Sequence, residues 1–294
     1  GVPAYASRRR PHVPMIVART AAEVRAAAGP GCSFVPTMGA LHEGHASLIR
    51  VAAGFGDPVV VSDFVNPTQF GPGEDYARYP RDLDGDAAIA EAAGADVLYA
   101  PAVDEVYPPG FQTTVDPGPL ADELCGASRP GHFVGVATVV TRLYGLVRPT
   151  RAIFGRKDYQ QLVLMQRVAR DLALPVEVIG APTVRESDGL ALSSRNRYLS
   201  ADERAAAAAV PDLLRRIAEA FADGERDHGA LLNVGGDLDI EYLELRAADL
   251  TDYVAGQPGV ALVACRVGAT RLIDNVELDP AAPEAAILTL AAKE

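Results

Sequence analysis

The sequence contains no tryptophan, three cysteines and very little lysine. The cysteines, Cys32, Cys125 and Cys265, lie far apart without the paired spacing of a metal site, which favours reduced thiols and a cytoplasmic location. No apolar run approaches the length of a membrane span, and no signal segment opens the chain, so we expect neither membrane insertion nor export. The 27 basic residues are outnumbered by 39 acidic ones, and the net charge of −12 argues against nucleic acid as a partner.

Lysine occurs at only two of the 27 basic positions, Lys157 and Lys293. Arginine carries a planar guanidinium, whereas lysine carries a compact ammonium group, and the two are not interchangeable. Lys157 therefore either marks a site that needs a compact cation or is present by chance. What the chain does contain is the composition of an ordinary globular protein, with 49% hydrophobic and 22% charged residues. Its 294 residues predict about two domains.

Apolar segments alternate with helical patterns through the first two thirds of the chain. We predict buried strands at 32–35, 58–65, 96–99, 152–154 and 175–179. Strands that alternate with helices are typical of an α/β protein with a Rossmann-like, doubly wound parallel sheet. We therefore expect residues 1–185 to form such a domain.

The pattern changes after this point. A capping box at Ser200–Glu203 opens an alanine-rich helix that Pro211 should end or kink. Three alternating segments then predict a small antiparallel sheet, at 240–245, 260–267 and 271–278. We expect residues 186–294 to form a smaller α+β C-terminal domain.

Two histidines, His42 and His45, lie where a predicted strand is followed by a predicted helix, within the segment Pro36–Arg50. Parallel sheets bind ligands at this position, and the first N–H groups of a helix suit a phosphate. Three interpretations are open: helix capping, zinc binding and nucleotide phosphate binding. Zinc is disfavoured because the metalloprotease helix motif places its histidines four residues apart, not three. His-x-Gly-His after a strand resembles the signature of adenylyl- and cytidylyl-transferring enzymes.

Further polar side chains follow other predicted strands or lie just beyond them, and the carboxyl ends of parallel strands converge on one crevice. They belong to Asn66, Gln69, Lys157, Asp158, Gln161, Ser193, Ser194 and Arg195. Cations and hydroxyl groups suit a triphosphate, and carboxamides suit a substrate with hydroxyl and carbonyl groups. Each of these side chains alone is typical of an ordinary surface, so the prediction rests on their combination.

Several motifs together resemble the pantothenate synthetase family, the pantoate–β-alanine ligases. The matching segments, in family order, are Pro36–His45, Phe64–Phe70, Tyr79–Arg81, Gly131–Phe133, Lys157–Gln161 and Ser193–Asn196. The resemblance implies an ATP-dependent condensation of pantoate with β-alanine through a pantoyl adenylate, with release of pyrophosphate and then AMP. It also implies Mg²⁺ with the ATP, a homodimer, and a C-terminal lid domain that closes over the first domain.

The resemblance also implies roles for individual residues, while the ligands of the metal stay unknown. The catalytic residues would be His42, Lys157, Arg195 and, as the general acid, His45. The substrate-binding residues would be Asn66, Gln161 and Gln69, the last serving both pantoate and β-alanine. ATP would be bound by Met38, Gly39, Ala40, Leu41, His42, Glu43, Gly44, His45, Gly155, Arg156, Lys157, Asp158, Val184, Leu192, Ser193, Ser194 and Arg195.

Three positions depart from the pattern expected of this family. Asp63 stands where an aliphatic residue is usual, Arg156 where a glutamate is usual, and Ala46 where a leucine is common. A buried carboxylate without a partner is unfavourable, so we expect Asp63 to have a partner or to contact solvent. Two alternative functions stay open: another nucleotidyltransferase of the superfamily, such as a cytidylyltransferase, and a nucleotide-binding regulator that has lost catalysis.

Overall fold

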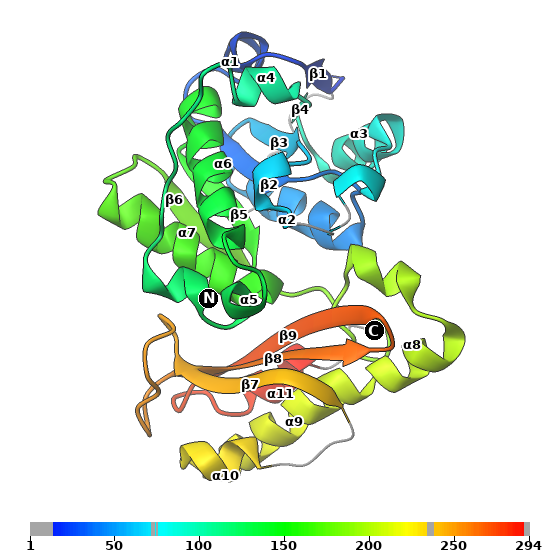
Figure 1. The fold of residues 1–294 in the computed structure, drawn as a ribbon, viewed down its shortest axis with the longest axis vertical. Coiled ribbons are helices and arrows are strands. Elements are labelled where there is room, and N and C mark those ends of the chain that lie inside the picture. Colours follow the sequence, from blue (N-terminus) through cyan, green and yellow to red (C-terminus); the bar gives the residue numbers. More distant parts are fainter. Residues whose placement is uncertain (1–13, 72–73, 75, 234–237, 291–294) are drawn as a thin grey trace. The chain divides into compact units, whose positions relative to one another are not determined.

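The computed structural model describes residues 14–71, 74, 76–233 and 238–290, which form two compact units (Figure 1). The first unit comprises the described residues up to Arg156 together with Leu164–Ala181. The second comprises Lys157–Val163 and the described residues from Pro182 onward. The functional division at residue 185, with nucleotide binding before it and a lid after it, stays a prediction.

The first unit is built on a six-stranded parallel sheet with the order β1-β4-β3-β2-β5-β6. Its strands are β1 (Ile16–Ala18), β2 (Ser33–Thr37), β3 (Val59–Asp63), β4 (Val97–Tyr99), β5 (Arg151–Gly155) and β6 (Glu177–Ala181). From β2 the chain winds to one side through β3 and β4, and later to the other side through β5 and β6. This order confirms the predicted doubly wound, Rossmann-like sheet.

Strand β1 and the start of β6 differ from the sequence-based expectation for reasons that the structure shows. Strand β1 was not predicted, because it has three residues and its Ile16 and Val17 are 46% and 42% exposed, which leaves no buried apolar run. It pairs with β4 at the edge of the sheet. The strand predicted from residue 175 begins at Glu177, since Pro175 has no N–H group to donate to the ladder.

Helices cover both faces of this sheet (Figure 1). They are α1 (Ala21–Ala28), α2 (Glu43–Gly54), α3 (Leu83–Ala93), α4 (Val103–Val106), α5 (Cys125–Ser128), α6 (His132–Val147) and α7 (Tyr159–Asp171), whose first turn belongs to the second unit. On one face, Ile49 of α2 and Ala90 of α3 share a core with Val61 of β3. On the other, Tyr144 of α6 makes an edge-to-face contact with Phe34 of β2, with ring centroids 6.4 Å apart. Side chains that alternate along the strands therefore pack into two hydrophobic cores, one on each face of the sheet.

Short 3₁₀ helices occupy several loops. They are η1 (Pro67–Gln69), η2 (Tyr76–Arg78), η3 (Pro119–Asp122), η4 (Arg156–Asp158) and η5 (Ser194–Tyr198). Among the described residues, no helix is both long enough and apolar enough to cross a membrane.

The second unit contains a three-stranded antiparallel sheet, which confirms that prediction. Its strands, in the order β7-β8-β9, are β7 (Asp239–Ala247), β8 (Gly259–Val267) and β9 (Thr270–Leu278). Its further helices are α8 (Ala201–Ala207), α9 (Ala209–Ala222), α10 (His228–Leu232) and α11 (Ala285–Leu290). Ile217 and Phe221 of α9 are fully buried in one core with Val263 and Cys265 of β8. Figure 1 shows the sheet lying across α9 and α11.

Pro211 interrupts the alanine-rich helical segment as predicted. Helix α8 ends at Ala207, and α9 begins at Ala209. In a continuous helix the ring of Pro211 would clash with the carbonyl group four residues earlier, which is that of Ala207. Pro211 instead lies in the first turn of α9, where its missing N–H group leaves no helical hydrogen bond unmade.

Gly135 allows α6 to approach η1 closely. A Cβ atom at position 135 would lie 2.5 Å from the backbone oxygen of Thr68, whereas one at Gly145 of the same helix would meet nothing within 4 Å. We expect Gly135→Ala to lower the free energy of unfolding by about 1–3 kcal/mol through this clash. Gly145→Ala, the matched control, should instead raise it by up to ~1 kcal/mol through better helix propensity. Urea unfolding followed by circular dichroism measures both changes, and equal stability of the two variants would contradict the close packing.

Candidate functional site

The turn between β2 and α2 is fixed by one buried carboxylate. Gly39 and Ala40 have positive φ angles of 78° and 51°, so the backbone reverses sharply after Thr37. The amide of Ala40 donates to Asp86 Oδ2 at 2.8 Å, and that of Leu41 donates to Asp86 Oδ1 at 2.6 Å. Asp86 lies on α3 and is 3% exposed. The conformation of this turn therefore depends on a side chain from the neighbouring helix.

His42 and His45 cap the first turn of α2 reciprocally. His42 Nδ1 accepts from the amide of Gly44 at 3.1 Å, and His45 Nδ1 accepts from the amide of His42 at 3.3 Å. The ring centroids are 4.2 Å apart. Because each Nδ1 is an acceptor, each neutral imidazole carries its proton on Nε2, an assignment that follows from the hydrogen bonds. The capping interpretation is thus correct, and it leaves both rings with an Nε2–H donor at a helix N-terminus, as phosphate binding requires.

The loop after β3 holds a buried pair of carboxamides. Asn66 is 2% exposed and Gln69 is 8% exposed. Asn66 Nδ2 donates to Gln69 Oε1 at 2.9 Å, and Gln69 Nε2 donates to Met38 Sδ at 3.1 Å. Asn66 Oδ1 in turn accepts from the hydroxyl of Tyr107 at 2.8 Å. The structure therefore brings Gln69 beside the β2–α2 turn and fixes which end of its carboxamide is the donor.

A second line of contacts holds the backbone of Gln69. His132 Nδ1 lies 2.9 Å from Gln69 O, and His132 Nε2 lies 2.9 Å from a guanidinium nitrogen of Arg129. Arginine has no acceptor, so His132 Nε2 accepts, and its Nδ1–H donates to the carbonyl group. Arg129 makes two 2.8 Å hydrogen bonds to Glu74, and these lower the pKa of the Glu74 carboxyl to about 2.

Sequence reasoning found some of these supporting residues and missed others. The Gly131–Phe133 motif contains His132, but Arg129 and Glu74 carry no local signal, because they meet only in the folded chain. Asp86 carries no distinguishing signal either, because it is one of two acidic residues in the first turn of α3. Asp82 is the residue that caps this helix, by accepting from the amide of Gly85 at 3.1 Å. An acidic residue near the start of a helix suggests an interaction with that helix, so the sequence does not indicate that Asp86 accepts from amides of the β2–α2 turn instead.

Two further predicted residues of the first unit, Gly155 and Arg156, lie at the end of β5 and just after it. Since the strands are parallel, the carboxyl end of β5 lies at the same edge of the sheet as those of β2 and β3. Gly155 is the last residue of β5. Arg156 follows it and donates from Nε to the carbonyl oxygen of Gly180 on β6 at 3.2 Å. Its guanidinium is therefore tied to the sheet.

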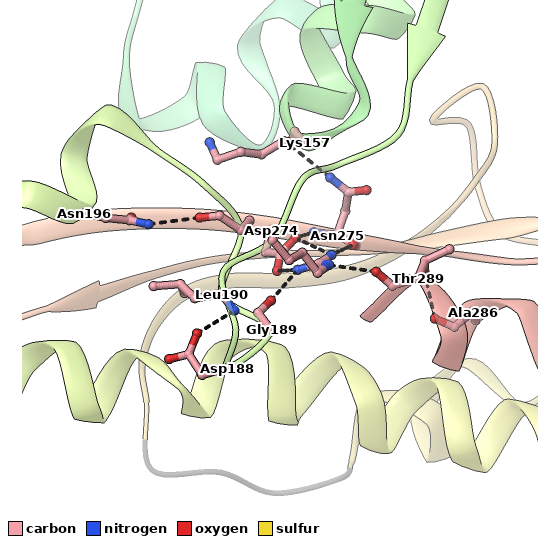
Figure 2. A network of polar contacts seen from close by, with 11 residues as sticks. Lys157, Asp188, Gly189, Leu190, Asn196, Asp274, Asn275, Ala286 and Thr289 are labelled. Carbon is pink, nitrogen blue, oxygen red and sulfur yellow. Dashed lines mark hydrogen bonds and ion pairs between the residues drawn. The ribbon is translucent and has the colours of Figure 1, made fainter. Parts of the chain in front are cut away.

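The second unit holds Lys157 through its backbone. Asn275 Nδ2 donates to Lys157 O at 2.9 Å (Figure 2). Lys157 Nζ lies 3.8 Å from Asp158 Oδ1. The next turn, which includes Gln161, is tied to the same unit because the hydroxyl of Tyr159 donates to Ala248 O at 3.0 Å.

A buried ion pair organises the loop that follows β6. Arg185 makes hydrogen bonds of 2.6 and 3.1 Å to Asp274, and their side chains are 4% and 1% exposed. Arg185 also donates to Thr289 O at 2.9 Å and to Gly189 O at 3.0 Å, so its guanidinium joins the loop to β9 and α11. Figure 2 labels three residues that accept from it, Gly189, Asp274 and Thr289. Asp274 and Asn275 are adjacent in the middle of β9, so the same part of this strand holds both the loop and Lys157.

The remaining predicted ATP residues lie on this loop. The amide of Leu192 donates to Val184 O at 2.9 Å, which brings these two residues together. Ser193 caps η5 by accepting from the amide of Arg195 at 3.3 Å. Ser194 O accepts from Arg197 at 2.7 Å. A joint action of these residues with the histidines of the first unit remains a prediction.

Breaking the buried ion pair should destabilise the second unit strongly. Arg185→Met removes the partner of Asp274 and leaves a buried carboxylate, which typically costs about 3–5 kcal/mol in the free energy of unfolding. Arg215→Met is the matched control, because the Arg215–Asp212 pair on α9 is 48% and 47% exposed. Such a pair contributes about 0–1 kcal/mol. Thermal unfolding of both variants tests the difference, and equal melting temperatures would show that the buried pair is dispensable.

Comparison with known proteins gives a consistent result. The model of the family described as pantoate-beta-alanine ligase matches residues 14–277. A pantothenate synthetase of Trichlorobacter lovleyi is 51% identical over 259 residues, which cover 85% of this chain and 92% of that protein. A pantothenate synthetase of Rhodospirillum rubrum is 50% identical over 275 residues, covering 88% and 98%.

Solved structures agree with these relatives. A crystal structure of pantothenate synthetase from Thermus thermophilus is 49% identical, with a TM-score of 0.82, and covers 89% of this chain and 99% of that one. A pantoate–β-alanine ligase from Francisella tularensis, complexed with beta-gamma ATP and β-alanine, is 35% identical, with a TM-score of 0.72 and coverage of 89% and 97%.

Proposed function

We propose, because this chain belongs to the pantoate–β-alanine ligase family, that it condenses pantoate with β-alanine in an ATP-dependent reaction. The observation that carries the proposal is the imidazole pair at the start of α2, with both Nδ1 atoms occupied by backbone amides. The Francisella tularensis relative, crystallised with an ATP compound and β-alanine, supports these two small molecules as substrates.

In the first step the pantoate carboxylate attacks the α-phosphate of ATP, and pyrophosphate leaves. Negative charge grows on the leaving group, and donors that are already in place stabilise it without reorganisation. His45 and His42 supply Nε2–H groups at the N-terminus of α2, where the helix dipole adds partial positive charge. Lys157 and Arg195 add full positive charges. His45 acts as the general acid in this proposal.

In the second step the amine of β-alanine attacks the acyl carbon of pantoyl adenylate, and AMP leaves. Gln69 suits substrate binding because Asn66 and Met38 orient its carboxamide, so little freedom is lost when a ligand binds. Gln161, in the first turn of α7, is the second carboxamide that we assign to pantoate. The other predicted ATP contacts, from Met38 to Arg195, belong to the same proposal.

Magnesium fits this site as a companion of the nucleotide. The described part of the chain contains no group of three or more His, Cys, Asp or Glu side chains that could hold a metal ion. Mg²⁺ commonly binds through one or two carboxylates together with substrate phosphates. Asp158, whose side chain is 50% exposed beside Lys157, offers such a carboxylate. The bound ion would neutralise charge on the phosphates.

The family resemblance also supports a homodimer, and three cysteines buried as thiols support a cytoplasmic location. Two alternative functions would give different results in an activity assay. A cytidylyltransferase would require CTP and a phosphorylated alcohol, and a regulator would bind ATP without turnover. The buried carboxamide pair favours a hydroxylated acid over a phosphorylated substrate, since neutral amides both donate and accept.

Replacing His45 tests the proposed general acid. We expect His45→Ala to lower kcat about 10²–10³-fold, because one donor to the leaving charge is lost. His228→Ala is the control, since His228 lies exposed at the start of α10. Release of AMP with pantoate and β-alanine is the measurement, and circular dichroism checks folding. Near-parental turnover of folded His45→Ala would exclude the role.

Isotope labelling tests the chemical path. A carboxylate is a poor acceptor for an amine and must first be activated, either as an acyl adenylate or as an acyl phosphate. If pantoate attacks the α-phosphate, one carboxylate oxygen stays with AMP after amide formation. We therefore expect ¹⁸O from labelled pantoate carboxylate to appear in AMP by mass spectrometry. Label in inorganic phosphate, with ADP as the other product, would overturn the adenylate path and leave the ligase assignment standing.

A further inference from the structure

Asp63 has a partner that the sequence did not reveal. It is the last residue of β3, where this family usually has an aliphatic side chain, and its carboxyl lies close to that of Asp86 under the same glycine. Met38 forms an isolated bridge with Asp63, which places the β2–α2 turn directly beside it. The expected partner of Asp63 is therefore a second carboxyl group.

Gly39 shows how closely the turn covers these two carboxyls. A Cβ atom at this position would lie 2.3 Å from Asp63 Oδ1 and 2.9 Å from Asp86 Oδ2. Any side chain here would displace the pair. The backbone of the turn thus lies directly against both carboxyl groups. A change in their charge or position would therefore shift the turn.

The hydrogen bonds decide which carboxyl carries a proton. Asp86 uses both of its carboxyl oxygens as acceptors, one for the amide of Ala40 and one for that of Leu41. Two negative carboxylates this close repel each other, so the pair retains one proton, and Asp63 is the group left to carry it. Burial and then the charge of Asp86 raise the pKa of Asp63 to about 6, whereas Arg19, which follows β1, acts in the opposite direction.

We propose that Asp63 and Asp86 form an acid pair sharing one proton, which positions the Met38–Leu41 turn for ATP. The inference rests on the proposed function, because it takes this turn as part of the ATP site. Asp63 touches no substrate in this scheme and acts through Asp86. When Asp63 loses its proton, two adjacent carboxylates repel each other beneath the turn and add negative charge near the triphosphate. Both effects weaken ATP binding.

The pH dependence of ATP binding tests the pair. We expect the KM for ATP of the wild-type protein to rise by roughly fivefold or more between about pH 5 and about pH 8, the lower range of couplings between linked sites. Asp63→Asn keeps the shape and a donor to Asp86 but cannot ionise, so its KM should not show this rise. Asp96→Asn is the matched control, because Asp96 accepts from the amide of Val59 at 2.7 Å at the other end of β3. It should follow the wild-type profile.

The comparison between wild type and Asp63→Asn is needed because other groups titrate in the same range. Histidines and the terminal phosphate of ATP both change charge near pH ~6. Asp63→Asn keeps His42, His45 and the same ligand, so the difference between the two proteins belongs to Asp63. By reciprocity, a non-hydrolysable ATP analogue should cause extra proton uptake by the wild-type protein at about pH 6, measured by calorimetry in two buffers.

Stability gives an independent measurement that needs no nucleotide. A carboxyl whose pKa is raised on folding stabilises the protein fully below its unfolded pKa, and that contribution is lost as pH rises through about 6. Asp63→Asn should therefore melt above the wild type at about pH 8, with the advantage shrinking towards pH ~4. An advantage that does not depend on pH would contradict the shared proton.

The outcomes separate this inference from the proposed function. If the wild type makes pantothenate but Asp63→Asn shows the same KM profile and proton uptake, the acid pair has no positioning role and the ligase assignment stands. If the wild type makes no pantothenate while the proton uptake with the analogue is found only with Asp63 present, the pair is upheld and the ligase assignment fails. If neither protein binds the analogue, both are overturned.

Discussion

Two hydrogen bonds from the amides of Ala40 and Leu41 to the buried carboxylate of Asp86 are the constraint on which the rest of the site depends. They fix a turn with two consecutive positive φ angles, which an unsupported chain would rarely keep. That turn determines where α2 begins, and therefore where His42 and His45 lie. It also places Met38 against the carboxamide of Gln69. One carboxylate thus couples the positions of the groups predicted to bind phosphate and substrate.

In the second unit a loop is also positioned by a charged side chain, but that side chain is a cation and not a carboxylate. Its loop after β6 is held by a cation, Arg185, which satisfies carbonyl groups of the loop and of α11 while pairing with Asp274. A buried ion pair gains little net free energy, since the loss of hydration offsets much of the attraction. Its effect here is geometric: the planar guanidinium joins three chain segments in one arrangement, and Asn275 next to it holds Lys157. In both units, a predicted site loop is positioned by a charged side chain from a different element.

The sequence was informative where a feature depends on local pattern and silent where it depends on long-range contact. Apolar runs such as 58–65 predicted the parallel sheet, and alternation predicted β7 to β9, because periodicity records burial directly. Strand β1 is mostly exposed, so its residues show no buried apolar pattern from which it could be predicted. His42 and Gln69 were identified through motifs, but Asp86, Arg129 and Glu74 were not assigned to the site. Each of them reaches its partner across more than 40 residues of chain, and their spacing in the sequence carries no information about that contact. Asp63 was flagged only because it departs from the family pattern, and its partner could be named only from the structure.

The sequence left helix capping and phosphate binding as competing interpretations of the two histidines, but the structure shows why they are compatible. An uncapped imidazole can carry its proton on either nitrogen and can rotate, so its donor would be poorly defined. In this turn each Nδ1 accepts from a backbone amide, which fixes both the tautomer and the ring orientation before a ligand binds. The cap therefore fixes two Nε2–H groups at a helix end that favours anions, as the proposed phosphate binding needs. Serine or aspartate in these positions could cap the helix equally well, but neither would present an N–H donor on the far side of the cap. In the proposed function, the choice of imidazole at both positions therefore follows from the ligand and not from the helix.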